Sequence, residues 1–177
     1  SRSLARQAIE RGAQLFESSA ATAITGERVE TEQGAVIADA VIVAVDGGLE
    51  RLLPELSGRV RTARLQMLGT GPAMDVEYVH PVNTRHGFEY FQQLPDRSIA
   101  LGGFRDRHVD AEWTHAAEPT AENQSLREAF LRDTVGTAAP ITHRWAASVG
   151  YTYTALPVFE QVRPGVWAIG AYSGTGN

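Results

Sequence analysis

The chain has 177 residues, of which 43% are hydrophobic and 21% charged, as in an ordinary globular protein. Its net charge of −5 argues against a general nucleic-acid binder, and no apolar run approaches the ~20 residues that cross a bilayer. All 16 basic residues are arginines and cysteine is absent, which excludes lysine Schiff bases, P-loop lysines, disulfides and thiolate nucleophiles. We therefore expect a cytoplasmic protein without a nucleic-acid or membrane partner.

The first part of the chain predicts one helix followed by short strands. Residues 4–12 show a helical apolar face that ends at a glycine, and residues 13–18 resemble a short strand. Two or three further strands follow, with turns at Thr25-Gly26 and Gln33-Gly34. The run from Ala40 to Val45 is apolar without alternation, which indicates a strand buried on both faces, as in a parallel sheet.

The middle of the chain predicts an antiparallel meander and a helix. Short strands separated by Gly-Pro, His-Pro-Val-Asn-Thr and Pro-Asp-Arg turns read "ARLQMLGT", "AMDVEYV", "GFEYFQQL" and "SIALGGF". A helix is predicted from Ala121 to Val135, with Leu126, Phe130 and Leu131 on one side and Gly136 at its end. The chain then returns to strand and loop, and "GVWAIGAY" is the last predicted strand.

Four stretches of the chain read, in this order, "ARQAIERGAQLFESSAATAI", "ADAVIVAVDGGLERLLPELSGRVRTARLQMLGTGP", "EYFQQLPDRSIALGGFRDR" and "HRWAASVGYTYTALPVFEQVRPGVWAIGAYSGTGN". They resemble the flavin-dependent D-amino acid oxidase superfamily, most of all its glycine oxidase, sarcosine oxidase and gamma-glutamylputrescine oxidase-like members. No single motif is decisive, and the resemblance rests on their order and spacing over nearly the whole chain.

The sequence also departs from the family pattern. The G-x-G-x-x-G unit that holds the FAD pyrophosphate is absent, and no helix follows the Gly-rich loop. Thr154 stands where the family usually has Asp, and Phe159 replaces an Ile-Gly pair. We therefore expect the chain to be the C-terminal half of a flavoenzyme, cut at both ends, that does not hold FAD tightly alone. In the intact protein the resemblance implies FAD, bound noncovalently as far as this cysteine-free segment shows.

The expected fold class is α/β (α+β): part of a Rossmann-like FAD-binding domain with an inserted antiparallel-sheet substrate domain. The resemblance places 1–47 in the FAD-binding domain and 48–142 in the substrate domain. It places 143–177 back in a truncated FAD-binding domain.

The resemblance also implies residues that contact the cofactor. These are Ala21, Gly47, Gly170, Tyr172, Ser173, Gly174, Thr175 and Gly176. Small residues let the backbone approach a ligand closely, which suits the C-terminal loop beside the flavin ring and ribityl chain. The alternatives are a surface turn for this loop, a turn that needs positive φ at Asp46-Gly47-Gly48, and an ordinary strand around Ala21. Asp46 itself is doubtful as a ligand, because it would repel a pyrophosphate.

Substrate contacts are expected from Tyr78, Tyr90 and Arg105, since the family's substrate domain faces the flavin and an Arg fork matches a carboxylate. Sheet packing of the tyrosines and a solvated Arg105 are the alternatives. Trp145 is expected in the core. The 5 histidines lack metal-ligand spacing and are expected in loops or at the surface, so no metal is predicted.

The predicted function is oxidation of a small-molecule amino acid or secondary amine by hydride transfer to FAD. Because the isoalloxazine carries the redox chemistry, no strong acid or base is required, and no catalytic residue is predicted. The alternative is a non-catalytic binding or interaction module on a flavoenzyme scaffold. A dehydrogenase that passes electrons to a carrier cannot be separated from an oxidase here. Substrate identity and oligomeric state are left open.

Overall fold

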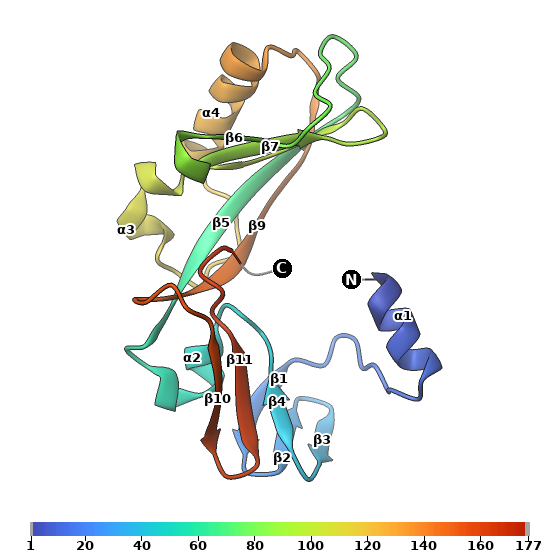
Figure 1. The fold of residues 1–177 in the computed structure, drawn as a ribbon, viewed down its shortest axis with the longest axis vertical. Helices are drawn as coiled ribbons and strands as arrows, with labels where there is room; N and C mark the ends of the chain where they lie inside the picture. Colours follow the sequence, from blue (N-terminus) through green and yellow to red (C-terminus); the bar gives the residue numbers. More distant parts are fainter. Residues whose placement is uncertain (1, 176–177) are drawn as a thin grey trace.

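The computed structural model describes residues 2–175, which form a mixed α/β fold with antiparallel sheets (Figure 1). The strands are β1 Ala21–Thr25, β2 Arg28–Thr31, β3 Gly34–Ile37, β4 Val41–Val43, β5 Val60–Thr70, β6 Val82–Thr84, β7 Glu89–Gln93, β8 Ile99–Gly103, β9 Ile141–Thr152, β10 Val158–Arg163 and β11 Val166–Gly170. The helices are α1 Arg2–Glu10, α2 Leu49–Leu52, α3 Val109–Glu112 and α4 Ala121–Phe130. Shorter turns are η1 Pro54–Leu56, η2 Arg85–Gly87 and η3 Arg105–Arg107, and the π-helix η4 Leu131–Val135 continues α4. None of these helices has the length and apolar composition needed to cross a membrane.

The described strands form three sheets. The hairpins β1-β2-β3 make one, and β10-β11-β4 make another, in which β4 and β11 run parallel as the apolar run predicted. The largest sheet has the order β6-β7-β8-β5-β9. The predicted turns of the first hairpins and the predicted helix that ends at Gly136 (φ +81) are confirmed.

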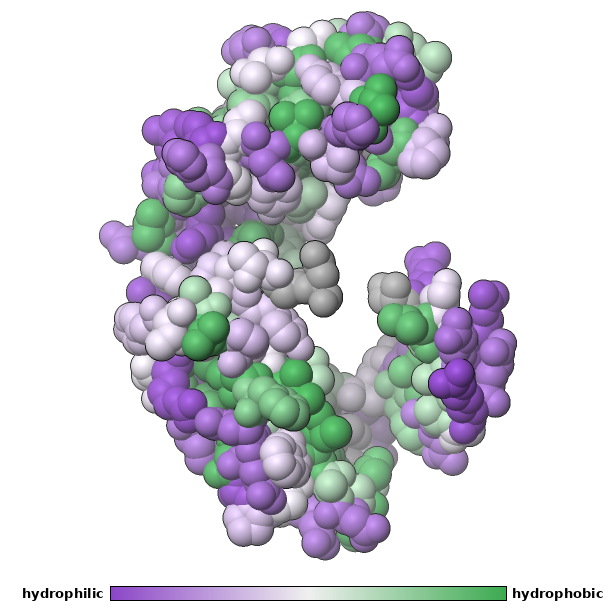
Figure 2. Space-filling view, viewed as in Figure 1, coloured by the Kyte–Doolittle hydropathy of each residue, from purple (hydrophilic) through white to green (hydrophobic). Residues whose placement is uncertain are grey.

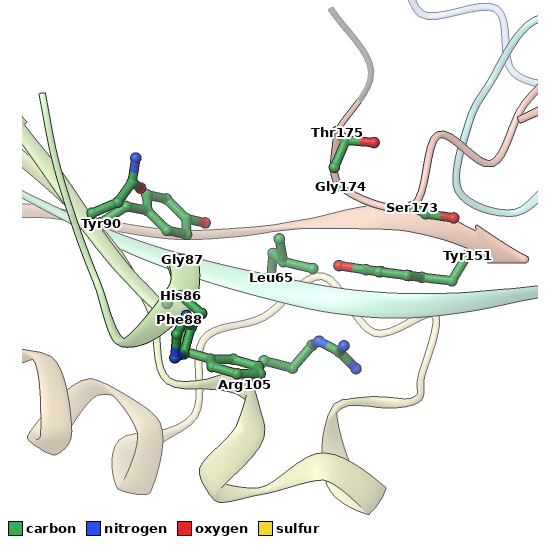
Figure 3. A pocket seen from close by; sticks show the side chains of 12 residues that line it. Leu65, His86, Gly87, Phe88, Tyr90, Arg105, Tyr151, Ser173, Gly174 and Thr175 are labelled. Carbon is green, nitrogen blue, oxygen red and sulfur yellow. The ribbon is translucent and has the colours of Figure 1, made fainter. Parts of the chain in front are cut away.

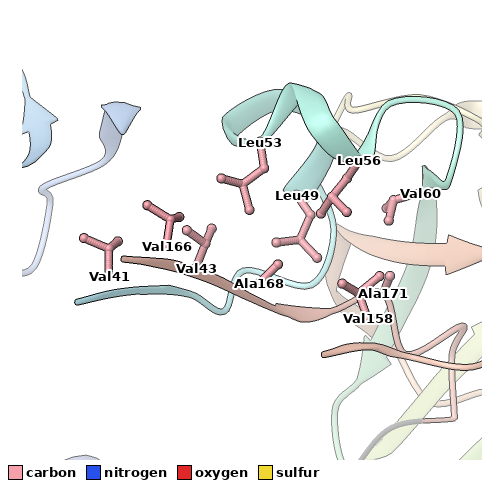
Figure 4. Close-up of a cluster of buried hydrophobic side chains, with 10 residues drawn as sticks. All are labelled: Val41, Val43, Leu49, Leu53, Leu56, Val60, Val158, Val166, Ala168 and Ala171. Atoms are coloured by element: carbon pink, nitrogen blue, oxygen red, sulfur yellow. The ribbon is translucent and has the colours of Figure 1, made fainter. Parts of the chain in front are cut away.

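Two apolar cores lie in two parts of the molecule. The first lies between the β4–β11 sheet and the helical turns α2 and η1, with Leu49, Leu53 and Val166 fully buried (Figure 4). The second lies between the five-stranded sheet and the α4–η4 helix, around Leu68 and Leu101. Long antiparallel pairing of β5 with β9 joins the two parts (Figure 1).

The pairing of β5 with β9 shows where the chain enters and leaves the large sheet, whereas the predicted domain boundaries at residues 48 and 143 stay a prediction. Helix α2 and turn η1, residues 49–56, pack on the core of the β4–β11 sheet. Strand β9 pairs with β5 along its whole length, from Val60↔Thr152 to Thr70↔Ile141. The chain therefore enters the large sheet at β5 and leaves it after β9.

Two predicted strands are absent from the structure. Residues 13–18 have no strand partner among the described residues, and residues 73–79 form a loop instead of a meander strand. The side chain of Gln93 forms hydrogen bonds with the backbone of that loop. Its Oε1 accepts from the Tyr78 amide (2.9 Å), and its Nε2 donates to the Ala73 carbonyl (2.9 Å). The strand that pairs with β7 is β6 instead, and it lies in the segment that was predicted as a turn.

Strand β4 is buried on one face only, which corrects the expectation of two buried faces. Val41 and Val43 point toward α2 and the core (Figure 4). Ile42, between them, is 62% exposed. Phe159 and Trp167 of the neighbouring strands are also exposed. Figure 2 shows hydrophobic residues gathered over this part of the molecule. Among the described residues, other elements cover one face of this sheet and leave its other face exposed.

Candidate functional site

A cavity of about 730 Å³ brings together residues from β5, β7, η2, η3, β9 and the C-terminal loop (Figure 3). Its lining consists of Leu65, Asn83, His86, Gly87, Phe88, Tyr90, Gly103, Arg105, Tyr151, Ser173, Gly174 and Thr175. Five of the residues predicted for cofactor or substrate are in this set: Tyr90, Arg105, Ser173, Gly174 and Thr175. The fold thus places substrate and cofactor candidates from distant parts of the chain around one space.

The arginine of the cavity is held by a turn of unusual backbone geometry. Phe104 has a left-handed φ of +64 and donates its amide to the Phe88 carbonyl at 2.8 Å, so that Arg105 begins η3 just beyond strand β8. The Arg105 guanidinium stacks on Tyr151 and on Trp113, each with its Cζ 4.8 Å from the ring centroid. Its Nη1 atom is buried and has no hydrogen-bond partner among the described residues.

The C-terminal loop is anchored by Asp46, at the end of β4. The Asp46 carboxylate accepts from the amides of Tyr172 (2.9 Å) and Gly150 (3.2 Å). Ser173 adds two contacts to β9, because its amide donates to the Gly150 carbonyl and its hydroxyl accepts from the Thr152 amide. These four hydrogen bonds fix the loop against the large sheet, at the edge of the cavity.

Gly174 has a left-handed backbone and little free space beside it. Its φ is +80, and a Cβ atom there would lie 3.1 Å from the Tyr151 hydroxyl. The loop passes over Tyr151 at close range for this reason (Figure 3).

Tyr90 lies on β7 and presents a neutral phenol to the cavity. Burial raises the pKa of Tyr90 above its usual value, and the positive charge of Arg127 offsets part of that rise in pKa. The hydroxyl is therefore protonated at neutral pH and is available as a hydrogen-bond donor.

Other predicted site residues lie outside this cavity. Tyr78 packs edge-on against Phe91 with ring centroids 4.8 Å apart, and its hydroxyl donates to the Val135 carbonyl. Ala21 lies in the first hairpin sheet, and Tyr172 contributes its amide to Asp46. Gly176 is outside the described residues.

Gly47 and Gly170 are required by close backbone packing. A Cβ on Gly47 would lie 2.7 Å from the Ser148 carbonyl carbon, and one on Gly170 would lie 2.8 Å from the Asp46 Cα. Asp46 has the left-handed φ of +58 that the turn alternative anticipated. Contact of either glycine with a cofactor stays a prediction.

No motif in the sequence points to five further residues of the cavity, Tyr151, His86, Asn83, Phe88 and Leu65. Leu65 and Tyr151 belong to the cavity because β5 and β9 pair in register, which no local pattern in either strand reveals. His86 has φ +59 in the tight η2 turn and lines the cavity from a loop. Trp145 was expected in the core but is 41% exposed, on β9.

Comparison with known proteins places the chain in a family. The family model "DAO: FAD dependent oxidoreductase" matches residues 1–177. The chain is 31% identical over 192 residues to a probable oxidoreductase, OrdL, of Rhizobium meliloti (strain 1021), covering 98% of this chain and 41% of that protein.

Solved structures share the fold. L-proline dehydrogenase from P. horikoshii superimposes with a TM-score of 0.76 at 17% identity, over 99% of this chain and 50% of that one. Glycine oxidase from Bacillus cereus ATCC 14579 gives 0.74 at 13% identity, over 97% and 49%. The chain thus spans about half the length of these proteins or less. It belongs to the DAO family of FAD-dependent oxidoreductases, which act on amino acids and amines.

Proposed function

We propose that the full-length protein oxidises an amino acid or secondary amine, with the large cavity as the place where the substrate meets a noncovalently bound FAD. The observation that carries this proposal is the convergence of Arg105 and Tyr90 with the loop Ser173–Thr175 around one cavity. When bound, FAD supplies the acceptor for the hydride equivalent. The residues of this chain bind and orient the substrate and exclude water.

The residues present fit a flavin edge. The cavity of about 730 Å³ is in the usual range for small-molecule and cofactor sites, ~300–1,000 Å³. On its loop side it is lined by Ser173, Gly174 and Thr175, whose small side chains leave room for a flat ring. A Cβ at position 174 would fill part of that room, beside Tyr151. With no cysteine in the chain, a thioether link from this segment to the flavin is not available.

Arg105 is the residue proposed to hold the substrate carboxylate. Its guanidinium is oriented by stacking on Tyr151, and its buried Nη1 lacks a hydrogen-bond partner among residues 2–175. A carboxylate would supply that partner through a charge-assisted hydrogen bond. The protonated Tyr90 hydroxyl, on strand β7, offers a further donor to the same cavity.

The test uses the full-length protein. After gel filtration its flavin absorbance is recorded, and candidate amino acids and amines are added without oxygen to follow flavin reduction. We expect retained FAD and reduction by at least one amino acid or secondary amine. A protein that retains no FAD, or whose flavin no such compound reduces, would overturn the proposal in favour of a binding module.

The carboxylate role is tested by Arg105→Met, with Arg107→Met on the same turn as the matched control. Arg107 is exposed and lies 3.8 Å from the Asp106 carboxylate. Arg105→Met should raise the KM for amino acids by about tenfold or more, since charge-assisted hydrogen bonds contribute ~1.5–3 kcal/mol. The KM for amines without a carboxylate should change little. An equal effect on both substrate types, or an equal effect of Arg107→Met, would contradict the assignment.

A further inference from the structure

A second, smaller cavity adjoins the candidate site. It measures about 310 Å³ and shares Arg105 and Tyr151 with the large cavity. Arg61, Trp113, Thr152 and Tyr153 complete its lining. Tyr90 and the residues proposed to contact the cofactor do not line this smaller cavity. The function proposed above therefore assigns it no role.

The smaller cavity contains a pair of arginines on one aromatic ring. The Cζ of Arg61 lies 4.2 Å from the centroid of the Trp113 ring, and that of Arg105 lies 4.8 Å from the same ring. Tyr151 packs edge-on against Trp113 at 5.6 Å, so both guanidiniums lie beside apolar walls. Such stacking fixes the planes of the guanidiniums while leaving N–H groups at their edges to bind a ligand.

These two charges have no counter-ion within the part of the chain that the structure describes. Neither Arg61 nor Arg105 forms an ion pair there. The linings of both cavities contain no Asp or Glu, although the chain carries a net charge of −5. A positive potential is thus concentrated where the cavities meet, and such a potential attracts anionic groups.

The acidic residues next to this pair in the sequence are committed to other arginines. Glu112, which precedes Trp113, is buried and binds Arg64 at 2.8 Å. Asp106, which follows Arg105, binds Arg85 at 3.0 Å. The neighbouring carboxylates therefore point away, and Arg61 and Arg105 remain for a ligand.

We infer that the smaller cavity is a subsite for a second carboxylate of the substrate, held by Arg61, with Arg105 between the two anionic groups. The inference rests on the proposed function, because it takes the large cavity as the place of the substrate amine. The substrate class is an amino acid or secondary amine with two carboxylates. Arg61 is a specificity-determining residue, because an uncharged substrate tail gains nothing from it.

The experiment measures binding by calorimetry to the full-length, FAD-loaded protein with ligands that have no amine to oxidise. Glutarate is compared with pentanoate, and adipate with hexanoate, because each pair has the same number of carbons and differs in the second carboxylate. We expect the dicarboxylate to bind about tenfold more tightly or better, as one added charge-assisted hydrogen bond implies.

Variants then locate the second carboxylate. Arg61→Gln should remove the preference for the dicarboxylate and leave the affinity for the monocarboxylate unchanged, while Arg61→Lys should keep part of the preference. Arg28→Gln, which removes the same charge from the exposed β2 hairpin, should keep all of it. Thermal unfolding of each variant checks that the exposed Arg61 position tolerates the change.

The outcomes separate the two proposals. If monocarboxylates bind through Arg105 but dicarboxylates bind no better, the second subsite is overturned and the proposed function stands. The same conclusion follows if Arg61→Gln and Arg28→Gln reduce the preference equally, which would show a general charge effect. If Arg105→Gln changes the affinity of neither ligand class, the proposed carboxylate role of Arg105 fails instead.

Discussion

The buried guanidinium of Arg127 donates a hydrogen bond to the carbonyl oxygen of Gly103, and so joins helix α4 to the turn that carries Arg105. Arg127 is fully buried, and its other hydrogen bonds go to the carbonyl (2.8 Å) and side-chain oxygen (3.1 Å) of Asn123. Burial lowers the pKa of Arg127 to about 10, which the negative charge of Glu112 partly opposes, and Tyr90 opposes it only at high pH, where its phenol ionises. Arg127 therefore stays charged at neutral pH, bonded to the cavity residue Gly103 and without a direct carboxylate partner among the described residues.

Replacing Arg127 by Met should disturb the position of Arg105 through Gly103. Met keeps most of the volume but leaves the Gly103 carbonyl without its donor, which costs about 1–3 kcal/mol of unfolding free energy. We also expect several-fold weaker binding of pentanoate to the FAD-loaded protein, because the Gly103–Arg105 turn loses its tie to α4. Urea unfolding and calorimetry measure the two effects.

The matched control for this prediction is Arg132→Met, in the π-helix that continues α4. Its side chain is 68% exposed and bonded to Asp133, so the unfolding free energy should change by less than about 0.5 kcal/mol. Unchanged pentanoate binding in Arg127→Met, together with unchanged or increased stability, would show that Arg127 does not position the turn.

Asp46→Ala should loosen the C-terminal loop and weaken FAD binding. The substitution leaves the amides of Gly150 and Tyr172 without their acceptor, and it places a Cβ-bearing residue without polar side-chain support at φ +58. Asp46→Asn keeps one acceptor oxygen and should lose less. The measurement is the Kd for FAD of the full-length protein and its two variants. Equal losses, or none, would mean that the carboxylate does not hold the loop.

Much of the fold could be predicted because its signals are local. The hairpin turns at Gly26 and Gly34, the helix end at Gly136 and the last strand each follow from neighbouring residues. The prediction of a strand over 73–79 was wrong because the side chain of Gln93, on another strand, forms hydrogen bonds with the backbone of that segment. A contact of this kind leaves no periodicity in the sequence.

The helix α4 itself was predictable from the sequence, but the face that it buries was only partly so. Of the predicted apolar side, Leu131 is buried and Phe130 packs against the second core, but the buried residues of α4 itself are Asn123, Gln124 and Arg127. Their partners lie on other elements: Asn123 donates to Glu112, and Gln124 donates to the Met67 carbonyl of β5. Polar residues of this kind look like a solvated face until the distant partner is known.

The candidate site was predictable in part. Arg105 and the loop Ser173–Thr175 came from the family resemblance, and the fold places them around one cavity. Tyr151 and Arg61 are on paired positions of β9 and β5, so their proximity follows from a strand register that spans 90 residues of sequence. Neither strand alone carries that information.

Gly174→Ala should impair FAD binding more than it impairs folding. The new Cβ would lie 3.1 Å from the Tyr151 hydroxyl at the cavity edge, whereas a Cβ at Gly58 would meet nothing within 4 Å. Both glycines have nearly the same φ, +80 and +77, so Gly58→Ala is the matched control for backbone strain of about 1 kcal/mol. Unfolding free energies should fall equally, and only Gly174→Ala should raise the Kd for FAD. A parallel rise in both variants would remove the loop from the site.

The stability of the buried network around Glu112 should depend on acid pH. Burial raises the pKa of Glu112, but hydrogen bonds from Arg64, Asn123 and Gln66 outweigh this and hold its pKa below the ordinary 4.5. A carboxyl whose pKa is depressed by folding stabilises the protein above the unfolded pKa, and that contribution is lost as pH falls through the folded pKa.

Glu112→Gln should therefore be less stable than the unmodified protein at neutral pH, and the difference should shrink in acid. Removing the carboxylate leaves the buried Arg64 without its counter-ion, which costs about 3–5 kcal/mol where the carboxylate is ionised. Urea unfolding of both proteins from about pH 7 to about pH 3 measures the difference. The exposed Glu122→Gln on the same helix as Asn123 should follow the unmodified protein at every pH. A Glu112→Gln difference that stays constant or grows below pH 4.5 would mean that folding does not depress the pKa of Glu112, and that the network depends on packing instead.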